Sequence, residues 1–339
     1  MEWTPPEDWL RIRTVDAHAE GEPLRVIVDG FPIPDGETVP ARRRDAAARL
    51  DGPRRALMWE PRGHADMYGC LLMPAVTPDA DLSVLFLHNA GFSTMCGHGI
   101  VAVTTVLLET GLHPMREPET ELAIDTPAGL VRATARVDAG RVREVRFRNV
   151  PSFALALDVP VTVPGLGRIS CDVAFGGAFY AFVAAADAGL ALVPEHAPRI
   201  IDVGRRITTA VAGALDIEHP DDPDIGFLYG TIFTGAAEAR GRHSRHACVF
   251  AEGELDRSPT GTGVSARLAV LEARGEEPGG WIEIESLIGS RFRGRVAGRA
   301  TVGSRPAIVP EVAGRAFLTG RHEFWIDPAD PWKEGFLLR

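Results

Sequence analysis

A short glycine-centred pattern occurs twice in this chain, and it constrains the fold more than any other feature. Residues 93–100 read STMCGHGI, and residues 258–264 read SPTGTGV. In each copy a small polar side chain precedes Gly-X-Gly, and an apolar segment with helical spacing follows. Gly-X-Gly at the start of a helix leaves backbone N–H groups unpaired at the positive end of the helix dipole. Each copy therefore predicts a helix N-terminus that can bind an anion.

The two copies differ in the side chain that precedes the glycines. The first copy has Cys96 at this position and the second has Thr260. Because a helix dipole stabilises a thiolate, we expect the Cys96 thiol to ionise more easily than a thiol in water. The scaffold repeats, whereas the chemistry of the side chain does not.

Each copy lies in a similar series of predicted elements. Strands are followed by a charged helix, more strands, the Gly-X-Gly helix and further strands. The order predicts two similar α/β halves that face each other, and a length of 339 residues agrees with two domains. The predicted elements are charged helices over 40–57 (interrupted near 51–53) and 197–215, Gly-X-Gly helices over 97–109 (ended by Gly111) and 263–274, a β-meander over 121–150, and a strand over 173–184.

Composition argues against several classes of function. The net charge is −10, and the basic run Arg42–Arg44 is too short to indicate nucleic-acid binding. Lys333 is the only lysine, which argues against Schiff-base chemistry with pyridoxal phosphate. Four scattered cysteines without a Cys-X-X-Cys pair predict neither a disulfide framework nor a zinc site, and they fit a reducing cytoplasm. The N-terminus lacks the pattern of an export signal. We interpret the apolar segment 173–193 as a buried strand and a short helix, not as a membrane span, because glycines and Asp187 interrupt it.

Two loops are rich in ionisable groups. Residues 17–22 read AHAEGE, and local pairing within a solvated turn is favoured over a metal site there. Residues 60–69 read EPRGHADMYG, and glycine and proline mark them as a loop. His64 in this loop could approach a substrate or could bond within its own loop.

Two patterns resemble sites that we do not predict. Residues 261–266, GTGVSA, fit the dinucleotide fingerprint, but that fingerprint follows a strand directly, and here the predicted strand ends near Ala251. His243, His246 and Cys248 could suggest a metal, but on a strand His243 points away from the other two.

Cys96 could also act as the nucleophile of a hydrolase, with His98 or His64 as its base. His98 lies too close in sequence for an easy thiol–imidazole contact, which argues against that class. A buried structural cysteine would not need the glycines beside it.

Five motifs together resemble the proline racemase family, and they span most of the chain from His18 to Ser304. These motifs are STMCGHGI, DRSPTGTGVSA, EPRGHADMYG, GGAFYAFV and FLYGTIF. The resemblance implies the α/β (α+β) fold of diaminopimelate epimerase, in which two pseudo-symmetric halves each wrap a curved mixed sheet around a central helix. It places the active site in the cleft between them. It also implies that no cofactor or metal is needed, that the partner is a small-molecule substrate, and that the protein forms a homodimer. We expect one half to comprise residues 1–152 with 310–339 and to carry Cys96, and the other to comprise residues 153–309 and to carry Thr260.

Family members with cysteine in both signatures are racemases or 2-epimerases that remove the Cα proton with one thiol and return it with the other. Thr260 departs from that pattern and resembles the branch that dehydrates trans-3-hydroxy-L-proline to Δ1-pyrroline-2-carboxylate. The resemblance implies that Cys96 accepts the Cα proton and that the following residues contact substrate: Gly97, His98, Asp256, Gly261 and Thr262. His64 is a further candidate for substrate contact.

Some questions stay open at this level. A threonine hydroxyl is too weak an acid and base for racemisation, but it can hydrogen-bond a leaving hydroxyl. Thr260, His64 and a bound water are all candidates for protonating that hydroxyl. The alternative functions are a 4-hydroxyproline 2-epimerase or proline racemase with an unrecognised second base, and a non-catalytic imino-acid-binding protein.

Overall fold

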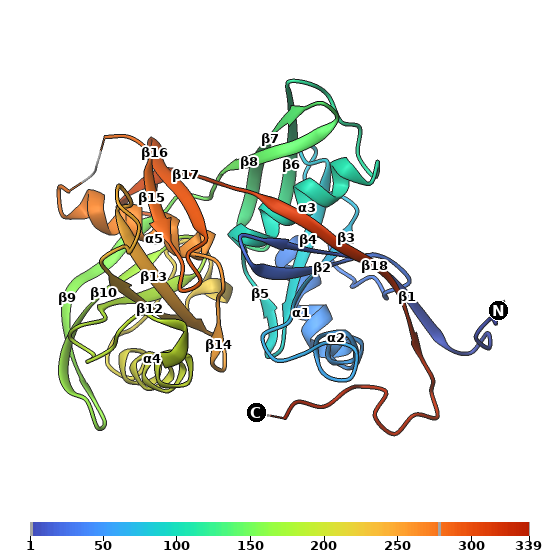
Figure 1. Ribbon diagram of the computed structural model, residues 1–339, viewed down its shortest axis with the longest axis horizontal. Helices are drawn as coiled ribbons and strands as arrows, with labels where there is room; N and C mark the ends of the chain where they lie inside the picture. Colours follow the sequence, from blue (N-terminus) through green and yellow to red (C-terminus); the bar gives the residue numbers. More distant parts are fainter. Residues whose placement is uncertain (1–2, 277–278, 339) are drawn as a thin grey trace.

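The protein consists of two lobes joined by strands that run between them (Figure 1). The computed structural model describes residues 3–276 and 279–338. The first lobe contains β1 (Leu10–Ala19), β2 (Glu22–Asp29), α1 (Val39–Arg49), α2 (Asp51–Met58), β3 (Tyr68–Met73), β4 (Leu82–His88), β5 (Gly91–Ser93), α3 (Gly97–Glu109), β6 (Glu119–Thr126), β7 (Gly129–Asp138), β8 (Arg141–Arg148) and the late strand β18 (Ala316–Ile326). The second contains β9 (Phe153–Val163), β10 (Gly167–Phe175), β11 (Phe179–Ala184), α4 (Ala197–Ala212), β12 (Leu228–Gly235), β13 (Ser244–Phe250), β14 (Glu254–Leu255), α5 (Gly261–Ala273), β15 (Ile282–Glu285), β16 (Arg291–Val302) and β17 (Arg305–Gly314).

The strand pairing of the first lobe is repeated in the second. In the first lobe β1–β2 and β3–β4 are antiparallel, β2–β3 and β4–β6 are parallel, and β6, β7 and β8 form an antiparallel meander. In the second lobe β10–β11 and β12–β13 are antiparallel, β11–β12 and β13–β15 are parallel, and β15, β16 and β17 are antiparallel. Each parallel pair is connected through one or two helices, because parallel neighbours need a long crossover. The repetition confirms the prediction of two similar α/β halves.

The two sheets are continuous through one strand pair. The last four residues of β17 pair with Val145–Arg148 of β8, while β17 also pairs with β16 along its length. β17 therefore belongs to both sheets. The residue boundaries of the two halves stay a prediction.

The helices α3 and α5 form the centres of the two halves. Every residue of α3 except its last is buried, and α5 is buried from Gly261 through Ala266. A helix that is apolar on all sides must be enclosed by other elements, and here each is wrapped by its own sheet. Because the predicted Gly-X-Gly segments are these two helices, the fold places both signature loops deep between the lobes.

The sequence predicts the ends of several helices correctly. α3 begins at Gly97 and ends at Glu109, and Gly111 follows with φ +75°, a conformation that favours glycine. The charged helix of the first half is interrupted as predicted, but the break falls at Leu50 and not at 51–53, because residues 51–53 form the first turn of α2. The β-meander over 121–150 is confirmed as β6, β7 and β8.

The predicted single strand over 173–184 is wrong, because the segment forms two antiparallel strands. β10 ends at Phe175 and β11 begins at Phe179, with Gly176 and Gly177 at the turn. Apolar residues on both sides of the two glycines favoured one long strand, because both strands are buried. The short helix predicted after it is also absent, since turns follow β11. Among the residues that the structure describes, no helix is long and apolar enough to cross a membrane.

The turn between β10 and β11 supports both signature loops. The Thr94 hydroxyl donates a hydrogen bond to the Gly177 carbonyl at 2.7 Å. A β-carbon at Gly176 would lie 2.2 Å from the Thr262 carbonyl oxygen, so only glycine permits this approach. The motif GGAFYAFV thus fixes the position of one loop relative to the other.

Candidate active site

The two signature loops meet face to face. A β-carbon at Gly97 would lie 2.5 Å from the Cα atom of Gly261, and one at Gly261 would lie 2.7 Å from the Cα atom of Gly97. Real β-carbons do not approach backbone atoms so closely, so both positions require glycine. The N-termini of α3 and α5 therefore point into one space, and both positive dipole ends act on whatever occupies it.

One pocket lies at this junction, and seven of the eight predicted site residues line it. Cys96, Gly97 and His98 come from the first loop, and the second contributes Thr260, Gly261 and Thr262 together with the preceding Asp256. The complete lining is Tyr68, Met95, Cys96, Gly97, His98, Tyr180, Tyr229, Phe250, Asp256, Thr260, Gly261 and Thr262.

His64 is the predicted site residue that the structure does not bring to the pocket. Its side chain is exposed, and its Nδ1 lies 2.7 Å from the Ala65 carbonyl oxygen of its own loop. Asn89 anchors the loop by donating to the His64 carbonyl and accepting from the Asp66 amide. The loop instead delivers Tyr68 to the pocket.

Cys96 and His98 are in direct contact, contrary to the expectation from their spacing. The Cys96 Sγ atom lies 3.1 Å from His98 Nδ1 and accepts a hydrogen bond from the Gly99 amide at 3.2 Å. The contact forms because Cys96 is the extended residue before α3, with φ −142° and ψ 114°, so its side chain turns back over the first helical turn. A thiol–imidazole pair therefore exists within one loop.

The protonation states of this pair are set mainly by burial. Burial raises the pKa of the Cys96 thiol well above its usual range, and the Gly99 amide only partly opposes this effect. The expectation of an easily ionised thiol is therefore wrong for the pocket without ligand. Burial also lowers the pKa of His98 to about 4, so its imidazole is neutral at pH 7 and can accept a hydrogen bond from the thiol.

Thr260 differs from Cys96 in conformation as well as in chemistry. It has φ +66°, which is strained for a β-branched residue, and its side chain does not cap α5. Its hydroxyl instead donates to Asp256 Oδ2 at 2.7 Å, and Asp256 Oδ1 accepts from the Ser258 amide at 2.7 Å. The Thr260 oxygen can still accept a hydrogen bond from a ligand.

Aromatic residues form much of the pocket wall, and the residue-level predictions missed them. Tyr68, Tyr180 and Tyr229 are the only tyrosines of the chain, and all three line this pocket with Phe250. The Tyr68 ring meets that of His98 edge-on at 4.8 Å, and the Tyr229 ring stacks on Phe250 at 5.5 Å. A usable signal existed, because each tyrosine lies in one of the quoted motifs.

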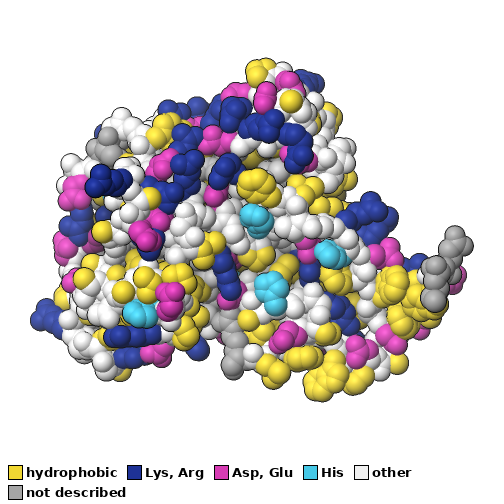
Figure 2. All heavy atoms as spheres, in the orientation of Figure 1, with side chains coloured by type: hydrophobic (Ala, Val, Ile, Leu, Met, Phe, Trp, Pro, Cys, Tyr) yellow, Lys and Arg dark blue, Asp and Glu magenta, His cyan; other side chains and the backbone are white. Residues whose placement is uncertain are grey.

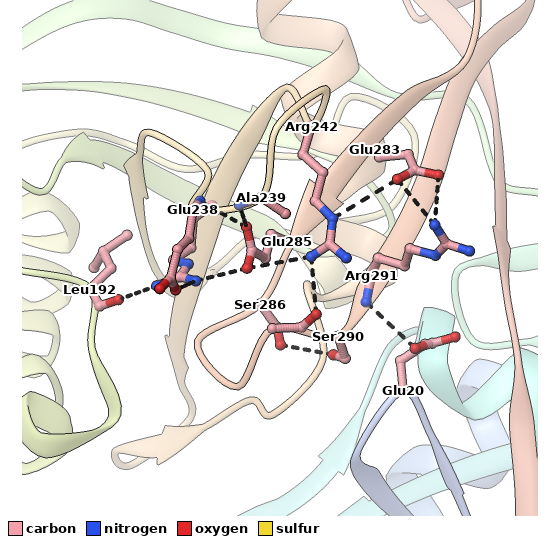
Figure 3. Close-up of polar contacts among 12 residues, drawn as sticks. Glu20, Leu192, Glu238, Ala239, Arg242, Glu283, Glu285, Ser286, Ser290 and Arg291 are labelled. Carbon is pink, nitrogen blue, oxygen red and sulfur yellow. Dashed lines mark hydrogen bonds and ion pairs between the residues drawn. The ribbon is translucent and has the colours of Figure 1, made fainter.

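The loop over residues 17–22 is not a solvated turn, and its glutamates bond to the other lobe. β1 extends to Ala19 and β2 begins at Glu22. Glu20 accepts a hydrogen bond from the Arg291 amide at 3.4 Å (Figure 3), and Glu22 accepts one from the Arg257 amide at 2.7 Å. Both carboxylates are buried, so this turn connects the lobes beside the pocket.

We expect replacement of Glu22 by glutamine to stabilise the protein more at pH 8 than at pH 4. Burial, followed by the charge of Asp256, raises the pKa of Glu22 well above its usual range. A carboxyl whose folded pKa exceeds its unfolded value of about 4.3 destabilises the folded state progressively as pH rises through that interval. Glutamine keeps the acceptor for the Arg257 amide but cannot ionise. The melting temperature should therefore rise by a few degrees at pH 8 and change less at pH 4, and equal shifts at both pH values would contradict this account.

A second groove lies between strands of the two lobes, and many of its charged side chains form ion pairs. It is lined by Glu20, Arg136, Arg143, Glu144, Glu283, Arg291, Arg293, Ala313, Gly314 and Arg315. Figure 2 shows basic side chains gathered over this face. Arg291 pairs with Glu283 at 3.2 Å (Figure 3), Arg293 pairs with Glu144, and Arg315 pairs with Glu20. Because these arginines already pair with glutamates of neighbouring segments, we interpret the groove as a structural contact and do not assign a ligand to it.

The two patterns that we set aside can now be placed in the fold. β13 begins at Ser244, so His243 precedes the strand that carries His246 and Cys248. Within residues 3–276 and 279–338, no group of three or more His, Cys, Asp or Glu side chains could hold a metal ion. The fingerprint-like glycines begin α5 after the loop that follows β14, not directly after a strand.

Comparison with known proteins identifies the family. The sequence profile of the proline racemase family matches residues 14–337. The chain belongs to the proline racemase family.

Its relatives within the family carry more than one name. The chain is 42% identical to a protein named trans-3-hydroxy-L-proline dehydratase from Colwellia psychrerythraea, over 100% of this chain and 96% of that protein. It is 45% identical to one named 4-hydroxyproline 2-epimerase from Streptosporangium roseum, over 96% and 97% of the two proteins.

A solved structure of the family shares the fold. The crystal structure of a hydroxyproline epimerase from Agrobacterium vitis with bound trans-4-hydroxy-L-proline superposes with a TM-score of 0.92. The two sequences are 35% identical, and the match covers 100% of this chain and 97% of that one. The two-lobed mixed α/β fold predicted from the resemblance is therefore confirmed.

Proposed function

We propose that this member of the proline racemase family dehydrates trans-3-hydroxy-L-proline to Δ1-pyrroline-2-carboxylate and water without a cofactor. The observation that carries the proposal is the position of Thr260, which lines the pocket opposite Cys96 where a second thiol would be needed for racemisation. The full-length match to a relative named as a dehydratase supports the same reaction.

The facing helix N-termini supply the electrostatic part of the mechanism. A Cα proton beside a carboxylate is weakly acidic, so its removal requires stabilisation of the charge that spreads onto the carboxylate. The backbone N–H groups that begin α3 and α5 are suited to hold that carboxylate. They act in a buried pocket, where such donors are more effective than in water.

Cys96 abstracts the Cα proton in this proposal, and His98 assists its ionisation. The neutral His98 imidazole lies 3.1 Å from the thiol and can relay its proton to water as substrate binds. The cationic ring nitrogen of the bound substrate further favours the thiolate, since a positive charge nearby lowers a thiol pKa. The electrons released at Cα then expel the hydroxyl on the adjacent carbon. In this proposal the Thr260 oxygen accepts a hydrogen bond from that hydroxyl. Gly97, Gly261, Thr262 and Asp256 complete the substrate contacts.

Purified protein is expected to release pyrroline carboxylate from trans-3-hydroxy-L-proline after exhaustive chelation and without added nucleotide. Mass spectrometry of the product, which has lost one water, provides the measurement. Failure to turn over any hydroxyproline isomer would contradict the proposal.

Two alternatives predict different products. A 4-hydroxyproline 2-epimerase or proline racemase, favoured by the relative from Streptosporangium roseum, would change the optical rotation of trans-4-hydroxy-L-proline or L-proline. A non-catalytic imino-acid-binding protein would bind the same ligands but would not exchange the Cα proton for solvent deuterium.

We also propose that the protein is a cytoplasmic homodimer. The family resemblance supports the dimer, and four free, buried cysteines fit a reducing compartment. Light scattering of the purified protein should give twice the monomer mass, and a monomer at micromolar concentration would contradict it.

A further inference from the structure

The three tyrosines of the pocket differ in the state of their hydroxyl groups. The Tyr68 hydroxyl donates to Ser93 Oγ at 2.8 Å, and that of Tyr180 shares a hydrogen bond of 2.8 Å with Thr262 Oγ1. The Tyr229 hydroxyl is buried and makes no hydrogen bond of ordinary length and angle with the residues that the structure describes. Its polar neighbour is the Tyr68 hydroxyl, which lies close enough to interact with it but donates its own proton to Ser93.

Burying a phenol hydroxyl without a good hydrogen bond destabilises the folded protein, so the state of the Tyr229 hydroxyl needs an explanation. Leaving a buried polar group unpaired costs about 1–3 kcal/mol, and most such groups in proteins are paired. Tyr229 is 8% exposed and lines the pocket beside Phe250. Its hydroxyl is therefore available to a ligand in a way that the other two are not.

The other candidates for protonating the leaving hydroxyl are less well placed. The Thr260 proton is engaged with Asp256 at 2.7 Å. His64 is exposed and lies outside the pocket lining. The neutral His98 is engaged with the Cys96 thiol, on the side where the Cα proton leaves.

We propose that Tyr229 is the catalytic residue that donates the proton converting the leaving 3-hydroxyl into water, an inference that rests on the proposed dehydration. The Cα–H bond breaks and its proton passes to Cys96 Sγ. The Cα electrons form the C2–C3 double bond, and the C3–O bond breaks with its electron pair on oxygen. The Tyr229 O–H proton joins that oxygen to form water. The enamine then becomes the imine by moving its N–H proton to C3. One net proton transfer through water, from the Cys96 thiol to the Tyr229 phenolate, then restores the thiolate and the phenol for the next turnover.

The chemistry of a phenol suits this task. Burial, followed by the charge of Glu254, raises the pKa of Tyr229 well above its usual range, so the phenol carries its proton at neutral pH. A departing hydroxide is a much stronger base than a phenolate, because water is a far weaker acid than a phenol, so the transfer remains favourable as the C3–O bond breaks.

The test compares two leaving groups in the Tyr229→Phe variant, which keeps the ring and removes only the hydroxyl. With trans-3-hydroxy-L-proline, kcat/KM should fall by about 10²–10⁴-fold, the usual contribution of a general acid. With trans-3-fluoro-L-proline, whose fluoride leaves without a proton, the loss should be at least ten-fold smaller. Exchange of the Cα proton of L-proline with solvent deuterium, which needs only the Cys96 side, should persist.

Two variants serve as matched controls, because Tyr68→Phe and Tyr180→Phe each remove a hydroxyl that already has a protein partner. They should affect the hydroxyl and fluoride substrates to a similar extent. If Tyr229→Phe folds poorly by circular dichroism, Tyr229→Leu repeats the comparison.

An equal loss with both leaving groups, or no loss with the hydroxyl substrate, would overturn the role of Tyr229. A wild-type protein that dehydrates no hydroxyproline would instead overturn the proposed function, so the two failures are distinguishable.

Discussion

Replacement of Cys96 by serine is expected to lower dehydration by about 10⁴-fold or more while leaving the fold intact. A serine hydroxyl is a far weaker acid than a thiol and cannot supply the base that removes a Cα proton. The hydroxyl can still accept the Gly99 amide that Cys96 now accepts at 3.2 Å, so the start of α3 should be preserved. Steady-state turnover together with circular dichroism measures both parts of the expectation.

Cys171 provides a control for this variant. It is a buried cysteine of β10 that does not line the pocket. Cys171→Ser should keep its turnover and lose only stability. Substantial activity in a folded Cys96→Ser protein would show that another group is the base.

Replacement of Thr260 by cysteine is expected to give the protein an epimerase activity that we do not expect of the wild type. The variant would carry a second thiol at a helix N-terminus facing Cys96, and two such groups can act on opposite faces of Cα. L-proline or trans-4-hydroxy-L-proline should then exchange its Cα proton from both faces, slowly, because the pocket is shaped for a 3-hydroxyl. Chiral chromatography of the substrate recovered from deuterated buffer measures the gain.

Dehydration by the same variant should fall by about ten-fold or more, because the thiol is a poor acceptor for the leaving group's O–H and replaces a hydroxyl bonded to Asp256 at 2.7 Å. Thr260→Ser is the matched control, since it keeps the hydroxyl and should keep most of the dehydration. A Thr260→Cys protein that gains no epimerisation and loses no dehydration would show that the two loops do not act on one substrate.

Gly97 and Gly261 explain why this prediction depends on the tertiary structure. The two residues are far apart in sequence, yet they pack directly against each other. A β-carbon added to either glycine would lie less than 3 Å from the backbone of the other. The roles of the pocket residues remain predictions, but their common location explains why the side chains before the two glycine pairs should act on the same ligand.

Local sequence determined the features that depend on neighbouring residues. The start of α3 at Gly97, the break at Leu50 and the stop at Gly111 follow from capping and from backbone freedom, which a short segment carries by itself. The repeated order of strands and helices likewise predicted two similar halves, because the order of elements limits their possible connections.

Tertiary structure decided the contacts and the energies within the pocket. The glycines at 176 and 177 interrupted the apolar run but did not by themselves show that the chain reverses there. The raised pKa of Cys96 comes from burial, which no local pattern reports. The exposure of His64 and the unpaired hydroxyl of Tyr229 depend on which segments pack around each side chain. The sequence by itself thus determined where helices start and which side chains precede the two glycine pairs, whereas only the packing of two lobes decided which of those groups share a pocket.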